Sequence, residues 1–242
     1  MAAPGTRNDE RVTPIAHDFD DAQTLAHTLA RDIANRLRDA LTARGAALLA
    51  VSGGNTPQRF LDALAHEILD WQRVTVTLTD ERRVPLVDAR SNEAMVRAHL
   101  LQGPAAAAAL VSLHVPDDED GIAEVAARID ALPLPFDAVV LGMGLDGHCA
   151  SLFPGADHLE SALRPDGSAR VMEMRAPAAP EPRITLTLPA LVAARAMYVL
   201  IEGRAKKGVL ERCLRERTPF AQAPVRAVLE NARSAPHVYW CP

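Results

Sequence analysis

Strand-like and helix-like stretches alternate along most of this 242-residue chain, and this alternation limits the fold more than any other feature. Short apolar runs rich in β-branched residues predict buried strands. Most of them are followed by a loop and then by apolar residues at helical spacing. Such a pattern is typical of an α/β fold in which a mostly parallel β-sheet carries helices on both faces.

A chain of this length suits one large α/β domain, and no linker interrupts it. We predict a single Rossmann-like domain over residues 11–242, preceded by a flexible tail over residues 1–10. Residues 176–182 are too rich in proline for a regular element and predict a surface loop. The predicted strands cover residues 46–51, 74–79, 110–115, 136–141, 169–174, 183–188, 196–202 and 237–240, and the predicted helices begin near residues 20, 57, 91, 122, 189 and 205.

Several expected helix ends have the residues that such ends need. Asp20 is the expected N-cap of the first helix, and Gly45 is its expected C-terminal end. Thr56, which a proline follows, suits the N-cap of the second helix. The third helix is expected to start at Ser91 or Asn92. The second and third helices are therefore expected to start a short loop after the strand that precedes each of them.

Composition excludes several classes of partner. The formal charge is −5, and no run of Lys and Arg with interleaved aromatic residues predicts a nucleic-acid surface. No apolar segment approaches the ~20 residues that cross a membrane, and the N-terminus does not resemble a signal peptide. The three cysteines are widely spaced and odd in number, which suggests a reducing compartment. We therefore expect a cytoplasmic protein whose partner is a small molecule.

Four polar or glycine-containing loops each follow a predicted strand. They cover Ser52 to Thr56, Asp80 to Arg82, Gly142 to His148 and Gly203 to Lys207. In a parallel sheet the carboxyl ends of the strands meet at one edge, where ligands bind. We therefore expect one site to use all four loops.

The first loop has the composition of an anion site. Backbone N–H groups and hydroxyls at a helix start can surround a phosphate, and no Walker motif is present, so a sugar phosphate is favoured over a nucleotide. Lys206 and Arg183 are further cationic candidates, while Lys207 fits a solvated helix face equally well. An ordinary helix cap remains the alternative for the loop itself. The predicted phosphate-binding residues of the loop are Ser52, Gly53, Gly54, Asn55 and Thr56.

The second and third loops have residues suited to catalysis. His148 can take a proton from water near neutral pH. Arg82 can orient a substrate oxygen, with Asp80 or Glu81 holding it through a bidentate pair, although an internal ion pair is the alternative. Cys149 follows His148 and is a possible nucleophile. A small packed residue is the favoured interpretation, because adjacent side chains in a turn usually diverge.

Three other types of site fit the sequence less well. Gly142, Gly144 and Gly147 match the GxGxxG of dinucleotide-binding folds, but they lie past the middle of the chain and no acid follows at the expected distance. No GxSxG motif surrounds a serine, which disfavours a covalent hydrolase with a Ser-His-Asp triad. Metal binding is not indicated, because His148 and His158 lack the spacing of helical ligands and the acidic run at 117–120 resembles a helix start.

Together the motifs resemble those of 6-phosphogluconolactonases, in the same order and over nearly the whole chain. The combination of the third motif with DERRVP is the specific part of the resemblance. The motifs are SGGNTP at 52–57, DERRVP at 80–85, GMGLDGHCASLFP at 142–154, RITLTLPAL at 183–191 and the segment 203–206.

The resemblance implies hydrolysis of 6-phosphogluconolactone to 6-phosphogluconate in the oxidative pentose phosphate pathway, with no metal or organic cofactor. His148 would activate water and then protonate the leaving ring oxygen. Arg82, with Asp80 near it, would offset the developing negative charge. Gly144 and Asp146 would belong to the same substrate-binding site, and Arg183 and Lys206 would hold the phosphate together with the loop at 52–56. The state of association is expected to be a monomer or a weak oligomer.

The sequence leaves some questions open. Cys149 stands where such enzymes usually have Thr. Which of Asp80, Glu81 and Asp146 orients the catalytic groups is not decided by spacing. A glucosamine-6-phosphate deaminase is an alternative, but the acid expected after the histidine is absent from Leu152-Phe153-Pro154. A non-catalytic sugar-phosphate sensor is another alternative, and it would need a DNA-binding segment for which residues 1–20 are too short.

Overall fold

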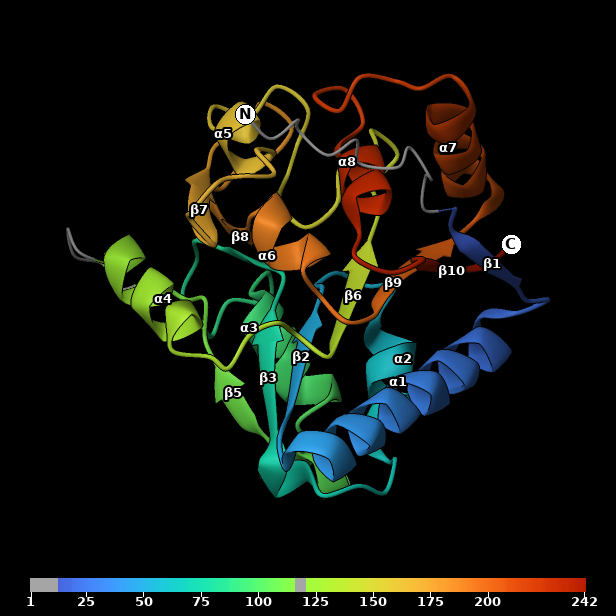
Figure 1. Ribbon diagram of the computed structural model, residues 1–242, viewed down its shortest axis with the longest axis vertical. Helices are drawn as coiled ribbons and strands as arrows, with labels where there is room; N and C mark the ends of the chain where they lie inside the picture. Colours follow the sequence, from blue (N-terminus) through green and yellow to red (C-terminus); the bar gives the residue numbers. More distant parts are fainter. Residues whose placement is uncertain (1–12, 116–120) are drawn as a thin grey trace, which may run out of the picture.

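The computed structural model describes residues 13–115 and 121–242 and contains one large and one small sheet (Figure 1). The predicted tail at 1–10 and the acidic run at 117–120 lie outside the described residues. All seven strands of the large sheet are parallel, in agreement with the predicted fold class. Their spatial order is β1 (Ile15–Asp18), β10 (His237–Cys241), β9 (Met197–Glu202), β6 (Ala138–Gly142), β2 (Ala47–Val51), β3 (Val74–Leu78) and β5 (Ala109–Val111).

The central strands are buried on both faces. Every residue of β2 is buried, as are most residues of β6 and β9, and helices flank the sheet. Strands covered on both faces have apolar runs without alternation, which is why these three could be predicted from sequence. The helices are α1 (Ala22–Arg44), α2 (Gln58–Ala65), α3 (Asn92–His99), α4 (Gly121–Asp130), α5 (Leu159–Ala162), α6 (Leu188–Val192), α7 (Arg204–Arg215) and α8 (Pro224–Asn231), with 3-10 turns η1 (Trp71–Arg73) and η2 (Gly103–Ala107).

A second, antiparallel sheet corrects the prediction for one of the loops. The order of its strands is β4 (Asp80–Arg82), β8 (Arg183–Leu186) and β7 (Val171–Met174). Residues 80–82 were expected to form a loop, because three charged residues in succession do not predict a strand. They pair instead with β8, so that Arg82 lies opposite Arg183 in the register. In Figure 1, β7 and β8 lie at the same end of the molecule as α6, α7 and α8.

The helix ends agree only in part with the sequence. Gly45 ends α1 in the left-handed conformation, with φ of 79°, and Ser91 caps α3, both as predicted. Asp20 does not cap α1, because Asp21 accepts the hydrogen bond from the Thr24 backbone N–H instead. Thr56 does not cap α2, which starts at Gln58 without a side-chain cap.

Some elements were not expected, and several strands are shorter than expected. Strand β1, the short helix α5 and helix α8 were not predicted, and β5 ends at Val111 rather than at residue 115. The strands β1 and β5 occupy the two edges of the large sheet, where partial exposure weakens the apolar pattern. No helix among the described residues is long and apolar enough to span a membrane.

Replacement of Asp21 by Ala is expected to destabilise the fold, whereas Asp20→Ala is expected to leave it unchanged. Asp21 accepts hydrogen bonds from the Thr24 backbone N–H and hydroxyl, both at 2.8 Å, and these bonds lower the pKa of its carboxyl. A lowered pKa means that the stabilisation is present above the pKa of the unfolded state and is lost as the pH falls through that of the folded state. Urea unfolding of both variants at pH 7 and pH 3 tests this, and equal midpoints for Asp21→Ala and wild type at pH 7 would contradict it.

Candidate active site

The four polar loops meet at one cavity of about 330 Å³. The strands that precede them, β3, β2, β6 and β9, are neighbours in the large sheet, so their carboxyl ends share one edge. Every residue predicted for the site lines this cavity except Asp146, which contacts His148 instead. The lining residues are Ser52, Gly53, Gly54, Asn55, Thr56, Pro57, Asp80, Arg82, Asn92, Gly142, Met143, Gly144, His148, Ala150, Phe153, Ala178, Arg183 and Lys206.

His148 is oriented by Asp146. Its Nδ1 lies 2.6 Å from Asp146 Oδ1, and this hydrogen bond is the main cause of the lowered pKa of the Asp146 carboxyl. When Nδ1–H donates to a carboxylate, the imidazole lone pair is on Nε2. The ring also packs on Phe153, with 4.2 Å between the two ring centroids. The hydrogen bond and the ring contact therefore hold the imidazole in one position.

Two glycines make this arrangement possible. A Cβ at Gly144 would lie 2.3 Å from His148 Cε1 and Nδ1, so only glycine leaves room for the ring. Gly147 has φ of 78°, and its carbonyl accepts a hydrogen bond from the Val225 N–H in α8. The loop is thus held from outside by a helix that the sequence analysis missed. No helix follows the loop directly, which removes the context that the dinucleotide interpretation requires.

Arg82 and Arg183 place two guanidinium groups beside each other. They face each other across the β4–β8 pair, and the Nε of each is buried without a hydrogen-bond partner in the described part of the chain. Burial, followed by the charge of Arg82, lowers the pKa of Arg183. Buried N–H donors with no partner and two like charges together favour the binding of an anion.

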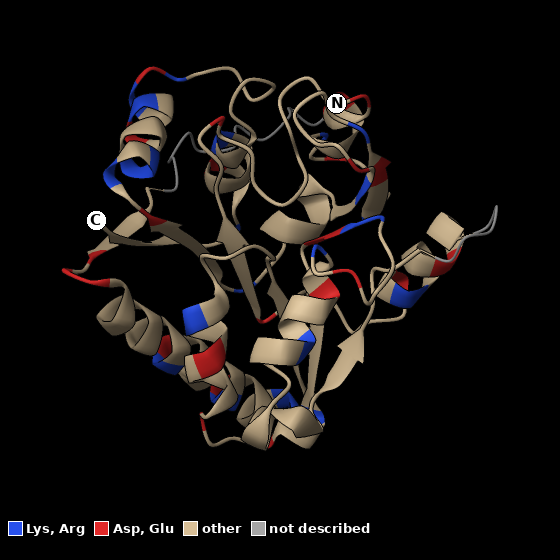
Figure 2. Ribbon diagram, turned by 180° about the vertical axis from the view of Figure 1, so that it is seen from behind, with Lys and Arg blue, Asp and Glu red and all other residues tan. Residues whose placement is uncertain are grey.

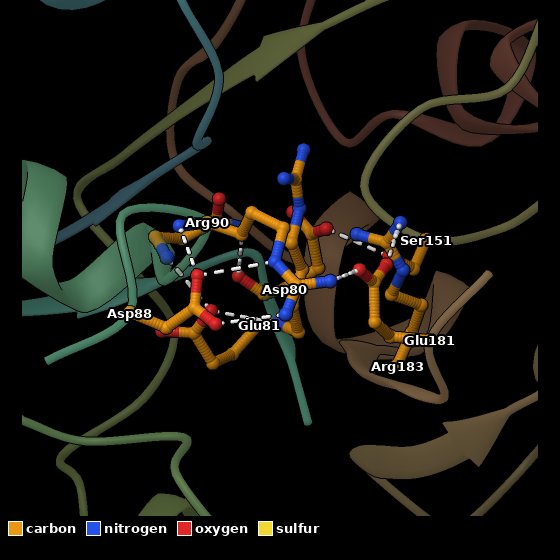
Figure 3. A network of polar contacts seen from close by, with 9 residues as sticks. Asp80, Glu81, Asp88, Arg90, Ser151, Glu181 and Arg183 are labelled. Carbon is orange, nitrogen blue, oxygen red and sulfur yellow. Dashed lines mark hydrogen bonds and ion pairs between the residues drawn. The ribbon is translucent and has the colours of Figure 1, made fainter. Parts of the chain in front are cut away.

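Asp80 is buried, and its carboxylate is hydrogen-bonded to two hydroxyl groups. Its carboxylate accepts hydrogen bonds from Ser151 Oγ at 2.7 Å and from Thr79 Oγ1 at 3.1 Å, as Figure 3 shows for Ser151. Within the described residues, neither Asp80 nor Glu81 hydrogen-bonds to the Arg82 guanidinium. The bidentate pair that we expected for Arg82 is therefore not formed.

Glu81 positions the backbone of the site. Its buried carboxylate accepts hydrogen bonds from the Arg82 N–H, the Ser91 hydroxyl and the first two N–H groups of α3. Burial raises the pKa of this carboxyl, while the hydrogen bonds oppose that change. Glu81 thereby connects β4 to the start of α3. Both segments contribute a residue to the cavity lining, Arg82 from β4 and Asn92 from α3.

Asn92 is the functional candidate that the sequence analysis missed. It lines the cavity and donates from Nδ2 to the Asp80 carbonyl at 2.9 Å. A Cβ at Gly53 would lie 1.9 Å from Asn92 Oδ1, so the glycine loop and α3 pack directly on each other. Its position beside the Ser91 cap, just after DERRVP, was the available signal. Only the close packing against Gly53 distinguishes it from an ordinary residue at a helix start.

The two lysines of α7 have different surroundings. Lys206 lines the cavity. Lys207 pairs with Asp18 at 2.7 Å, and its Nζ lies 3.8 Å from the centroid of the Trp240 ring, so it belongs to the β1 edge. Figure 2 shows basic residues in blue at both ends of α7, so their position along the helix alone does not select one of them. Lys206 is thus the lysine of this helix that a bound anion would contact.

Cys149 does not have the surroundings of a nucleophile. It is buried, and burial raises the pKa of its thiol, which disfavours the thiolate. Among the described residues, no group of three His, Cys, Asp or Glu side chains is arranged to hold a metal ion.

Comparison with known proteins identifies the family. Residues 20–240 match the family model described as glucosamine-6-phosphate isomerases/6-phosphogluconolactonase, and the chain belongs to this family. It is 44% identical to a 6-phosphogluconolactonase of Rhizobium meliloti over 228 residues, which is 93% of this chain and 98% of that protein. It is 45% identical to a 6-phosphogluconolactonase of Pseudomonas aeruginosa over 223 residues, which is 91% of this chain and 92% of that one.

A solved structure agrees with the sequence comparisons. The crystal structure of a 6-phosphogluconolactonase from Shewanella baltica superposes with a TM-score of 0.91 at 36% identity, covering 96% of this chain and all of that one. The resemblance and the fold class inferred from the sequence are therefore confirmed.

Glu81→Gln is expected to lower the free energy of unfolding by about 1–3 kcal/mol, because the amide nitrogen of Gln cannot accept the N–H and O–H bonds that the carboxylate receives. Urea denaturation at pH 7 measures the change. Glu160→Gln, at an exposed position on α5, is the matched control and is expected to show no change. Equal stability of the two variants would contradict the role assigned to Glu81.

Gly144→Ala is expected to move the imidazole of His148, because the new Cβ would overlap the ring and the Asp146 carboxylate. A displacement of about 1 Å in a catalytic group lowers turnover by about 10²-fold. Gly208→Ala is the control, since a Cβ there meets nothing within 4 Å. Initial rates of lactone hydrolysis compare the two, and full activity in Gly144→Ala would show that His148 tolerates displacement.

Proposed function

We infer that this chain hydrolyses 6-phosphogluconolactone to 6-phosphogluconate in the pentose phosphate pathway, and we propose that His148 is its general base. Nearly the full length of the chain aligns with relatives named 6-phosphogluconolactonase. One observation supports this assignment of roles: His148, oriented by Asp146, lines the same cavity as Arg82 and Arg183. The Nε of each arginine has no hydrogen-bond partner among the described residues.

The first step is attack of water on the lactone carbonyl. His148 Nε2 takes one proton from the water as its oxygen bonds to the carbonyl carbon, and the carbonyl oxygen gains the negative charge. Asp146 stabilises the imidazolium that results, because its carboxylate accepts the hydrogen bond from Nδ1. Arg82, which lines the cavity, offsets the charge on the oxygen.

The second step opens the ring. The tetrahedral intermediate collapses, the bond between the former carbonyl carbon and the ring oxygen breaks, and the proton on His148 Nε2 passes to that oxygen. The products are the new hydroxyl and a carboxylic acid, which loses its proton to solvent near neutral pH. His148 returns to the neutral state, so one base serves both steps.

The phosphate is assigned to the cationic and glycine-rich side of the cavity. Arg183 and Lys206 supply positive charge, and the loop from Ser52 to Thr56 supplies backbone N–H groups and hydroxyls just before α2. Gly54 has φ of 94°, a conformation that glycine adopts without strain and that lets the loop turn around a ligand.

A deaminase is supported less well by this cavity. The segment after His148 contributes Ala150 and Phe153 to the lining, whereas Leu152 is fully buried. None of these side chains can transfer a proton, so the segment lacks the acid that this alternative expects.

The proposal includes the cellular location of the protein and its state of association. The three cysteines are buried and unpaired, which supports the cytoplasmic location expected from the sequence. The monomeric or weakly associated state expected from the sequence is proposed together with it.

His148→Ala is expected to lower the rate of lactone hydrolysis by about 10²–10⁴-fold, because it removes the base from both steps. Freshly generated 6-phosphogluconolactone is the substrate, and spontaneous hydrolysis is subtracted. His158→Ala is the matched control, since that side chain is 62% exposed and pairs only loosely with Asp157, at 3.8 Å. Binding of 6-phosphogluconate by His148→Ala is expected to persist.

Two outcomes would contradict the proposal. No rate above background for the wild-type chain, with 6-phosphogluconate still bound, would favour the sensor alternative. Equal loss of hydrolysis and of product binding in His148→Ala would make the histidine a binding residue rather than the base.

A further inference from the structure

The guanidinium of Arg183 shares its acidic partner with a second arginine outside the cavity. Glu181, at the end of the proline-rich loop, accepts hydrogen bonds from both Arg90 and Arg183. The bond to Arg183 Nη2 is long, at 3.4 Å, and Arg90 Nη1 pairs with the other carboxylate oxygen of Glu181. Figure 3 shows the Arg90 guanidinium between Asp88 and Glu181, with Arg183 on the other side of Glu181.

Arg90 is itself firmly held. Its Nε and Nη2 donate to the two carboxylate oxygens of Asp88 at 3.1 and 2.8 Å, and its backbone N–H donates to the same group. These bonds lower the pKa of Asp88 to about 2. A bidentate pair of this kind fixes the plane of the guanidinium, so Arg90 presents Nη1 to Glu181 in one direction.

This arrangement keeps Arg183 only weakly neutralised. Glu181 is the only carboxylate that hydrogen-bonds to Arg183 within the described residues, and it does so through one long bond. Arg183 lines the cavity together with Arg82, and its Nε is buried without a partner among the described residues. If Glu181 were released from Arg90, its carboxylate could close on Arg183 as a bidentate pair and compete with a bound anion.

We propose that Arg90 is a positioning residue for anion binding: it holds Glu181 away from a full ion pair with Arg183, which leaves Arg183 free for the phosphate of the substrate. Arg90 is not among the residues that line the cavity. The inference rests on the proposed function only in taking a sugar phosphate as the anion. It adds the Asp88–Arg90–Glu181 chain as the element that sets the affinity of the site.

The test is a double-mutant cycle, read by calorimetric titration of 6-phosphogluconate and of inorganic phosphate. Arg90→Ala is expected to bind both ligands about tenfold more weakly, because Glu181 then neutralises Arg183. Adding Glu181→Gln to this variant removes the competing charge and is expected to restore binding to within about threefold of wild type. Arg90→Lys, which keeps a cation near Glu181, is expected to bind with intermediate affinity.

A merely structural role for Arg90 predicts the opposite result for the double variant. If Arg90 only anchored the proline-rich loop, the double variant would bind as weakly as Arg90→Ala or more weakly, because both sides of the contact are lost. Arg164→Ala is the matched control, since Arg164 forms a similar pair with Asp166, two residues along the chain, away from the cavity. It is expected to bind as wild type does.

Three outcomes would overturn the inference: unchanged binding in Arg90→Ala, no recovery in the double variant, or weaker binding in Glu181→Gln alone than in wild type. The last of these keeps the test decisive should Arg90→Ala not fold. The titrations need no turnover, so a wild-type chain that fails to hydrolyse the lactone but shows the expected cycle contradicts the proposed function alone. A wild-type chain that binds neither ligand overturns the inference.

Discussion

The parallel pairing of β3, β2, β6 and β9 is the constraint on which the site depends. Neighbouring strands lie about 4.8 Å apart, so the ends of these four strands span only about 15 Å. The register keeps those ends level, with Val51 beside Leu78 and Gly142 beside Leu200. Loops from four distant parts of the sequence therefore open on one cavity of about 330 Å³, a volume that suits a single sugar phosphate.

The small antiparallel sheet adds what the parallel sheet cannot. Pairing of β4 with β8 brings Arg82 and Arg183 together, although two like charges side by side destabilise a fold. Buried acids on the same strand lessen this repulsion, and among the described residues Glu181 is the carboxylate that pairs with either guanidinium, through one long contact of 3.4 Å to Arg183. The charge therefore remains available for a ligand, and the site retains a binding function at some cost in stability.

Sequence alone could predict the strands of the sheet centre, the shared edge of the four loops and the placement of His148, because burial on both faces leaves an unmistakable apolar pattern. It could not predict that Asp80 to Arg82 form a strand, since their partner lies about a hundred residues away and charged residues hide the pattern. Nor could the residues alone show where Lys207 lies, because its partner Asp18 is on an edge strand that is largely exposed. These failures share a cause: each depends on a contact between distant segments.

The glycines at 53 and 144 show why a motif has to be interpreted through its contacts. In each case a Cβ would overlap a polar side chain of the cavity, Asn92 in one and His148 in the other. In a dinucleotide-binding loop such glycines let the backbone approach a pyrophosphate, whereas here Gly144 lets the loop approach the imidazole of its own His148. The same GxGxxG spacing thus arises from a different steric requirement, and the helix that would complete a dinucleotide site does not directly follow the loop. What identifies the loop is the atom that occupies the space next to each glycine, and that atom belongs to the protein.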